Sequence, residues 1–212
     1  MTERNTTLVI GIIGPPCSGK STVARVVESR GGVWIDADAI AKEQLSDAEV
    51  IADLVESFGI AILASDGSVS RAQIADLVFG DDDESHRRLK KLESIIHPRT
   101  HRIIQSRLDT ATARGALYII LDVPLLLESG WESQCDQIWC MQIEPARHRQ
   151  LLAARGWSET ELARREQRQL PWAEKRRRST WVIQNDGSVD DLREKVVRML
   201  NQSRPAPTTH RS

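Results

Sequence analysis

The chain has 212 residues, of which 29 are lysine or arginine and 30 are aspartate or glutamate, so its formal net charge is −1. This length suits one elaborated domain or two small ones with a proper core. The balanced charge excludes a global basic field of the kind that recruits nucleic acid or anionic membranes.

Membrane, secretory and disulfide-rich classes are also disfavoured. No apolar stretch reaches the length of a membrane span, and we do not expect the polar start MTERNTT to act as a signal peptide. The cysteines Cys17, Cys135 and Cys140 are odd in number and form no C-x-x-C pair. We therefore expect reduced thiols in a cytoplasmic protein rather than a disulfide framework or a zinc site.

Strand-like and helical segments alternate along the chain. Apolar runs of strand length lie at Leu8–Ile13, Val33–Ile35, Leu117–Leu121, Ile138–Ile143 and Trp181–Ile183. Most are continuous, which is typical of strands covered on both faces of a parallel sheet. Helical patterns include Ser21–Ser29, Ala48–Phe58, a long amphipathic segment Glu84–Thr110 interrupted by Pro98, and a capping box at 158–161. The alternation predicts an α/β fold.

A phosphate-binding motif follows the first strand. Gly14–Ser21 fits G-x-x-x-x-G-K-[ST] and lies between a strand and a helix, the context in which this pattern is informative. Glycines let successive backbone N–H groups point into one concavity, and the helix adds its positive end. Lys20 is expected to reach the β- and γ-phosphates, and the Ser21 hydroxyl to ligate Mg²⁺. We predict an ATP site formed by Gly14, Cys17, Ser18, Gly19, Lys20, Ser21 and Thr22.

Two carboxylates end the second strand. Asp36 and Asp38 lie in VWIDADAIA, where a parallel strand meets the ligand side of its sheet. A carboxylate there can accept the proton of an attacking hydroxyl or help to hold Mg²⁺, although both can equally be loop or helix-capping residues. If the strand ends at Asp36, only one of them needs to face the phosphates. No N-K-x-D segment of a GTPase is present, so a small kinase is favoured.

Five segments behind the phosphate loop resemble those of the dephospho-CoA kinase family, in order along nearly the whole chain. They are IDADAIAKE at 35–43, DGSVSRAQIADLVFG at 66–80, LESIIHPRT at 92–100, LDVPLLLESGW at 121–131 and VIQNDGS at 182–188. The fourth is the most family-specific. The resemblance implies a three-layer P-loop NTPase fold with a five-stranded parallel sheet, a helical insertion and an arginine-rich lid. It also implies ATP-dependent phosphorylation of the 3′-hydroxyl of dephospho-CoA, the last step of coenzyme A biosynthesis.

The resemblance also implies roles for individual residues. Asp38 is expected to be the catalytic base, beside Lys20. Asp122 is expected to orient Mg²⁺, unless it only caps a strand turn. Expected contacts to dephospho-CoA are Asp38, Arg71, His97, Pro124, Leu125, Leu126, Glu128 and Arg165. Expected contacts to ATP beyond the loop are Arg155, Asn185 and Gly187. Pro124–Leu126 can also be core, His97-Pro98 a helix break, and Arg176–Arg178 a solvated surface.

The expected domain boundaries follow from the spacing of the strands. About 80 mostly helical residues separate the second strand from the third, far more than a simple crossover needs. We predict a nucleotide-binding core at 1–59, 116–146 and 179–202, a helical acceptor-binding insertion at 60–115 and a lid at 147–178. The polar, proline-rich residues 203–212 are expected to be disordered.

Two departures from the family pattern bear on the binding of ATP. The phosphate loop has Pro15 and Cys17 where glycines are usual, and proline has no N–H to donate. The lid has Leu151 where an arginine is usual, for which Arg147 or Arg149 can compensate. These departures leave open which lid arginines contact ATP.

Two rival functions remain at the level of sequence. Another small-molecule or nucleoside kinase, of the uridine or shikimate type, accounts for the loop and lid but not for DVPLLLESGW. A non-catalytic nucleotide sensor predicts nothing about Asp38. For partners we expect dephospho-CoA and ATP, no nucleic acid or membrane, and a monomer or small homo-oligomer.

Overall fold

The structure is a computed structural model that describes residues 7–80, 82–157, 162, 167 and 169–203. The chain forms two compact units. One comprises residues 1–35 and 110–212 and is called the sheet unit below, and the other comprises Asp36–Asp109 and is called the helical unit.

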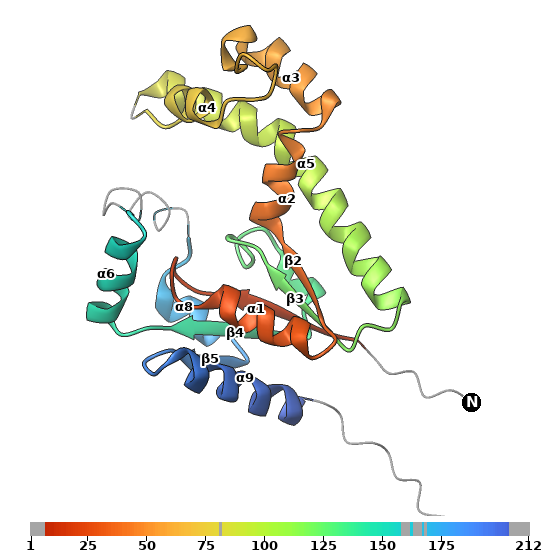
Figure 1. The fold of residues 1–212 in the computed structure, drawn as a ribbon, viewed down its shortest axis with the longest axis vertical. Coiled ribbons are helices and arrows are strands. Elements are labelled where there is room, and N and C mark those ends of the chain that lie inside the picture. Colours follow the sequence, from red (N-terminus) through yellow and green to blue (C-terminus); the bar gives the residue numbers. More distant parts are fainter. Residues whose placement is uncertain (1–6, 81, 158–161, 163–166, 168, 204–212) are drawn as a thin grey trace, which may run out of the picture. The chain divides into compact units, whose positions relative to one another are not determined.

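A five-stranded parallel sheet organises the sheet unit (Figure 1). Its strands are β1 Leu8–Ile13, β2 Val33–Asp36, β3 Tyr118–Asp122, β4 Gln137–Gln142 and β5 Trp181–Gln184. Their order is β2-β3-β1-β4-β5, so β1 is central and its carboxyl end lies between those of β3 and β4. The predicted α/β fold is confirmed, and each predicted strand agrees with the structure to within one residue at either end.

One face of this sheet is covered by α1, Lys20–Ser29, and α9, Val189–Ser203. Val23 and Val27 of α1 and Val196 of α9 are fully buried against Ile10 and Trp139 of the sheet. This apolar layer holds the start of α1 at the carboxyl end of β1. The sheet unit also contains η2 Trp131–Gln134, α6 Pro145–Ala154 and α8 Trp172–Arg177.

The helical unit has its own core. It contains α2 Ala37–Gln44, α3 Ala48–Phe58, η1 Ile60–Ile62, α4 Arg71–Val78 and most of α5, Asp83–Ala113. The buried cluster consists of Val50, Leu54, Ile62, Ile74, Val78, Ile95 and Ile96. The predicted insertion began at residue 60, but α2 and α3 belong to this unit because Val50 and Leu54 of α3 contribute fully buried side chains to its core.

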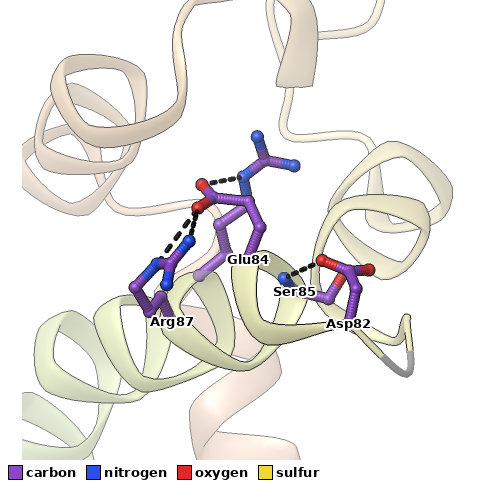
Figure 2. A network of polar contacts seen from close by, with 5 residues as sticks. Asp82, Glu84, Ser85 and Arg87 are labelled. Atoms are coloured by element: carbon purple, nitrogen blue, oxygen red, sulfur yellow. Dashed lines mark hydrogen bonds and ion pairs between the residues drawn. The ribbon is translucent and has the colours of Figure 1, made fainter.

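The long helix α5 begins with a capping arrangement of polar side chains (Figure 2). Asp82 accepts hydrogen bonds from the backbone N–H of Ser85 at 2.9 Å and from its hydroxyl at 2.7 Å. Both bonds favour the ionised carboxylate and lower the pKa of Asp82 to about 2. In the first turn of α5, Glu84 forms ion pairs with Arg87 and Arg88, which lie three and four residues further along the helix. The charges stabilise the first turns of a helix that is largely exposed there.

The predicted interruption of this helix at Pro98 is wrong. Helix α5 continues through Pro98, although proline removes one backbone hydrogen bond. Ile95 and Ile96 are buried before it and Ile104 after it. Burial of the same apolar stripe on both sides stabilises a continuous helix against the loss of that bond.

Several expectations lie outside the described residues. They are the capping box at 158–161, the site residue Arg165 and the tail beyond Ser203, the last residue of α9. In the described part of the chain, no helix combines the length and apolar character that crossing a membrane requires.

Candidate nucleotide-binding site

The phosphate loop joins β1 to α1 in a conformation that ordinary residues adopt poorly. Gly19 has φ 102° and Cys17 has φ 61°, and Cys17 is the only non-glycine residue with positive φ among those that the structure describes. A Cβ added at Gly14 would lie 2.6 Å from the Cβ of Met141 on β4. The motif glycines are therefore required by backbone conformation at Gly19 and by close packing at Gly14.

Lys20 is held against the loop by two hydrogen bonds. Its Nζ donates to the backbone oxygen of Gly14 at 3.0 Å and to that of Pro15 at 3.2 Å. As the first residue of α1, Lys20 also lies at the positive end of the helix dipole. The ammonium group therefore already lies against the loop that is predicted to bind the phosphates.

Donor groups collect in this loop without protein partners. Within the part of the chain that the structure describes, no protein acceptor contacts the backbone N–H of Cys17, Gly19, Lys20 or Ser21. The buried Oγ of Ser18 also lacks a partner there. Buried polar groups are rarely left unpaired in native proteins, so this cluster fits an anion with several oxygens, such as a polyphosphate.

Asn185 follows β5 and contacts the loop from a distant part of the sequence. Its Nδ2 donates to the backbone oxygen of Ser18 at 2.8 Å, and the residue is 7% exposed. A Cβ at Gly19 would lie 2.7 Å from this Nδ2, so the glycine also makes room for the asparagine. The predicted contact of Asn185 with adenine is thus accompanied by a hydrogen bond that fixes the loop.

Gly187 lies in the turn before α9. A Cβ added at this glycine would lie 2.5 Å from the Oδ2 of Asp191, the oxygen that accepts hydrogen bonds from the N–H and the hydroxyl of Ser188. The turn is therefore closed by a cap on α9, and glycine is needed for the close approach of Asp191.

Asp122 is positioned at the same edge of the sheet as the loop. It ends β3 opposite Ile12 of β1, two residues before Gly14. Ser21 is exposed on the first turn of α1. Carboxylate and hydroxyl oxygens are ligands that Mg²⁺ accepts, usually together with water and phosphate. Among the described residues, no group of three or more His, Cys, Asp or Glu side chains forms a metal site.

The segment after β3 divides into exposed and buried positions. Pro124 is exposed and Leu125 is half-buried, whereas Leu126 is fully buried. A Cβ at Gly11 of β1 would lie 2.9 Å from Leu126 Cδ1, so Leu126 packs against the central strand. Of the three residues predicted to contact dephospho-CoA here, Leu126 has the position of a core residue.

Glu128 belongs to a buried polar network. Its Oε1 accepts a hydrogen bond from the backbone N–H of Leu170 at 2.6 Å and lies 3.6 Å from Nζ of Lys175. Lys175 also donates to Gln169 Oε1 at 2.6 Å, and its Nζ lies 4.8 Å from the centre of the Trp172 ring. Burial lowers the pKa of Lys175, and the charge of Glu128 opposes that shift. The network joins the loop after β3 to the start of α8.

A cavity of about 340 Å³ adjoins the phosphate loop. Its wall includes Pro15 of the loop, His148 of α6, and Trp172 and Arg176 of α8. Nε2 of His148 lies 2.7 Å from the backbone oxygen of Pro16. The cavity therefore has aromatic, cationic and imidazole groups next to the loop that is predicted to bind phosphate.

The arginines of the predicted lid differ in their surroundings. Arg155 is exposed at the C-terminal end of α6, and Arg165 lies outside the described residues. Arg177 pairs with Glu174 and Arg178 pairs with Glu132, whereas Arg176 faces the cavity. Arg176 and Arg177 are exposed, as the alternative of a solvated surface requires, and Arg176 also lines the cavity.

The helical unit carries the other predicted site residues. Strand β2 ends at Asp36, whose carboxylate caps α2 by accepting from the N–H of Ala39 at 3.0 Å. Asp38 is exposed in the first turn of the same helix. Arg71, at the start of α4, and His97, within α5, are also exposed. Asp36 thus has the capping role that the sequence left open, and the exposed carboxylate of Asp38 has no hydrogen-bond or ion-pair partner among the described residues.

The cysteines are free thiols. Burial raises the pKa of Cys135 to about 12, and burial also raises the pKa of Cys140. Neither thiol is therefore activated as a nucleophile.

Sequence reasoning missed four residues around the loop, namely His148, Trp172, Lys175 and Arg176. No local motif marks them, because His148 and Pro16 are 132 positions apart and Glu128 and Leu170 are 42 positions apart. The sequence placed Arg176 within the predicted lid but did not single it out as a site residue.

Comparison with known proteins identifies relatives along almost the whole chain. The sequence profile described as Dephospho-CoA kinase matches residues 8–191. A dephospho-CoA kinase from Rhodopirellula baltica is 55% identical over 195 residues, which cover 92% of this chain and 90% of the relative. A crystal structure from Thermus thermophilus has a TM-score of 0.74 and 34% identity, covering 93% of this chain and 98% of its own. A dephospho-CoA kinase structure from Campylobacter jejuni has a TM-score of 0.67 at 19% identity, covering 92% and 97% of the two chains, and supports the fold alone.

Proposed function

The chain belongs to the dephospho-CoA kinase family, and from this we propose that it transfers the γ-phosphoryl group of ATP to the 3′-hydroxyl of dephospho-CoA, giving CoA and ADP. The observation that carries the proposal is the phosphate loop, whose unpartnered N–H groups, Ser18 hydroxyl and Lys20 ammonium converge in a chain matched to the family over residues 8–191.

The loop would bind the triphosphate with groups that are already in place. Lys20 would exchange its two backbone oxygens for phosphate oxygens, a favourable exchange because hydrogen bonds to a charged acceptor are stronger than those to a carbonyl. The amides of Cys17, Gly19, Lys20 and Ser21 would donate to the same group. These fixed donors would stabilise charge that shifts between the phosphates during transfer.

Asp38 is our choice for the group that accepts the proton of the 3′-hydroxyl. Its carboxylate is exposed, and the other carboxylate of the same segment, Asp36, already caps α2. Mg²⁺, held by Ser21 and with Asp122 orienting its water ligands, would neutralise charge on the phosphates. Among these residues, only Asp38 is assigned a proton transfer.

Further residues are assigned to the binding of dephospho-CoA. Arg71 offers a guanidinium fork that suits phosphate oxygens, and His97 offers an exposed imidazole. Pro124 and Leu125 offer apolar surface to the adenosine. Glu128 can accept a further donor through Oε2, since its two contacts with described residues both use Oε1. Arg165, with Arg155 on the ATP side, completes the assignment made from sequence.

The remaining assignments concern cellular context. Free thiols at all three cysteines support a reducing compartment such as the cytoplasm. The net charge of −1 supports small-molecule substrates rather than nucleic acid or membrane as partners. A monomer or small homo-oligomer is part of the same proposal.

An acceptor panel tests the proposal. ADP release from Mg·ATP would be followed with dephospho-CoA, adenosine, uridine, AMP or shikimate, and the products identified by mass spectrometry. We expect turnover with dephospho-CoA and a product heavier by one phosphoryl group. The Lys20→Ala variant serves as the blank for contaminating kinases. Turnover with another acceptor only would leave a P-loop kinase of different specificity, and ATP binding without turnover would favour a sensor.

A further inference from the structure

The phosphate loop of this chain has fewer backbone donors than its motif length suggests. Residues 15 and 16 are both proline, and proline has no N–H. The N–H of Ser18 donates back to the oxygen of Pro15 at 3.3 Å and closes a turn. The first free amide after Gly14 therefore belongs to Cys17.

The direction of this amide is coupled to the carbonyl before it. The peptide between Pro16 and Cys17 is trans, as are all peptides that the structure describes, so its C=O and N–H point in opposite directions. Nε2 of His148 lies 2.7 Å from that oxygen. Holding the oxygen toward α6 therefore turns the Cys17 N–H away from α6.

Cys17 needs such support because its own conformation is unfavourable. At φ 61°, the Cβ of a residue with a side chain crowds the following carbonyl oxygen, so this conformation is less favourable than right-handed backbone. Strained conformations of this kind persist only where the surroundings hold them. The relevant contacts here come from Lys20, His148 and Asn185, which together bind the oxygens of Gly14, Pro15, Pro16 and Ser18.

The contacts of these three residues are not equivalent once a nucleotide binds. Under the proposed function, Lys20 turns to the phosphates and releases the oxygens of Gly14 and Pro15. The oxygens of Pro16 and Ser18 do not depend on Lys20, so His148 and Asn185 keep them fixed. Of these two residues, His148 binds the oxygen of the peptide group that also contains the Cys17 N–H.

We propose that His148 is a positioning residue for the phosphate loop, which orients the N–H of Cys17 toward the polyphosphate by holding the carbonyl of Pro16. The inference rests on the proposed function in so far as the ligand is ATP. A carbonyl oxygen can only accept, so Nε2 of His148 must carry a hydrogen. Another side chain with an amide N–H of similar reach, such as glutamine, should therefore preserve the effect, and alanine should not.

Binding of ATP and ADP to His148→Ala, His148→Gln and the unmodified chain would be measured by calorimetry without any acceptor. Gln150→Ala, an exposed change on the same helix, controls for effects on α6. We expect His148→Ala to weaken nucleotide binding about tenfold, the usual net effect of one well-placed hydrogen bond, and His148→Gln to recover most of it. In turnover, KM for ATP should rise while KM for dephospho-CoA stays constant.

The outcomes separate the two proposals. If His148→Ala binds ATP as tightly as the unmodified chain, or if alanine and glutamine weaken binding equally, the positioning role is wrong. If the unmodified chain binds ATP but does not phosphorylate dephospho-CoA, the proposed function fails while the comparison of variants still tests His148. Circular dichroism and thermal unfolding of each variant identify any general loss of structure, and His148→Gln, the milder change, then decides.

Discussion

The two units hold their candidate site residues in different ways. In the sheet unit, Lys20, Glu128, Lys175 and Asn185 are engaged by hydrogen bonds or ion pairs, and Lys175 is only 2% exposed. In the helical unit, no described residue offers a hydrogen bond or ion pair to the side chains of Asp38, Arg71 or His97, which are exposed. The sheet unit is therefore preorganised, whereas side chains of the helical unit would gain their polar partners from the substrate.

This difference predicts that Asp38 affects turnover rather than stability. Asp38→Asn keeps the size of the side chain and removes its basicity. We expect kcat to fall by about 10²–10⁴-fold, the usual contribution of a positioned base, while ATP affinity and the melting temperature stay near those of the unmodified chain. Steady-state kinetics with ATP and dephospho-CoA, calorimetric ATP titration and thermal unfolding measure the three quantities.

Asp36→Asn is the matched control for this variant. Asparagine caps helices as well as aspartate does, so the bond to the Ala39 N–H should survive and activity should change little. A larger loss of turnover at Asp36 than at Asp38 would exchange their proposed roles.

In contrast to Asp38, Glu128 should affect the stability of the fold. Glu128→Gln keeps an acceptor for the Leu170 N–H but leaves the buried ammonium of Lys175 without a counter-charge. Removing one partner of a buried pair typically costs about 3–5 kcal/mol of unfolding free energy. Urea unfolding at neutral pH measures this loss. The control Glu174→Gln, which breaks an exposed pair with Arg177, should change the unfolding free energy far less, because water screens that pair.

The pH dependence of this variant provides a further check. Burial already lowers the pKa of Lys175 below its unfolded value, and loss of Glu128 lowers it further. The folded state then releases the proton more readily than the unfolded state, so stability rises with pH between the two pKa values. Part of the deficit of Glu128→Gln should therefore be regained as the pH approaches the unfolded lysine pKa. A deficit that is constant with pH would show that the charge of Lys175 is not its cause.

The accuracy of the predictions made from the sequence also differs between the two units. The phosphate loop was predictable because its chemistry resides in consecutive residues, Gly14 to Ser21, and in backbone geometry that glycine makes accessible. The strands were predictable because buried parallel strands are continuous apolar runs. The contacts of Asn185 with Ser18 and of His148 with Pro16 were not, because they bridge 167 and 132 positions of sequence.

The errors in the helical unit have a physical cause as well. The start of the insertion at residue 60 and the break at Pro98 were both inferred from local signals, namely strand spacing and proline. Packing overrides these signals, since Leu54 and Ile62 share one core and the stripe that includes Ile95 and Ile104 is buried on both sides of Pro98.

An ion pair within the helical unit should contribute less than the buried pair of the sheet unit. Arg99 of α5 donates to Asp53 Oδ2 of α3 at 2.7 Å, with side chains 23% and 43% exposed. Exposed pairs contribute about 0.2–1 kcal/mol, because water screens their attraction. Asp53→Asn should therefore lower the unfolding free energy by that amount in urea titrations, and the loss should shrink in 1 M salt. A loss as large as that of Glu128→Gln would contradict the view that buried charge distinguishes the two units.

The smallest effect is expected at Asp82, which accepts hydrogen bonds from the backbone N–H and the hydroxyl of Ser85 (Figure 2). These bonds lower its pKa to about 2, below the value in the unfolded chain. A carboxyl group with a lowered folded pKa contributes stability above its unfolded pKa, and this contribution is lost as the pH falls through the folded value. Between about pH 4 and pH 2, the unmodified chain should therefore lose stability that Asp82→Asn, which caps without ionising, does not lose. Thermal unfolding of both proteins across this range tests the point, and hydrogen exchange at the start of α5 localises it. Parallel pH profiles would mean that the carboxylate of Asp82 titrates alike in the folded and unfolded chains, and that the cap depends on hydrogen-bond geometry rather than on charge.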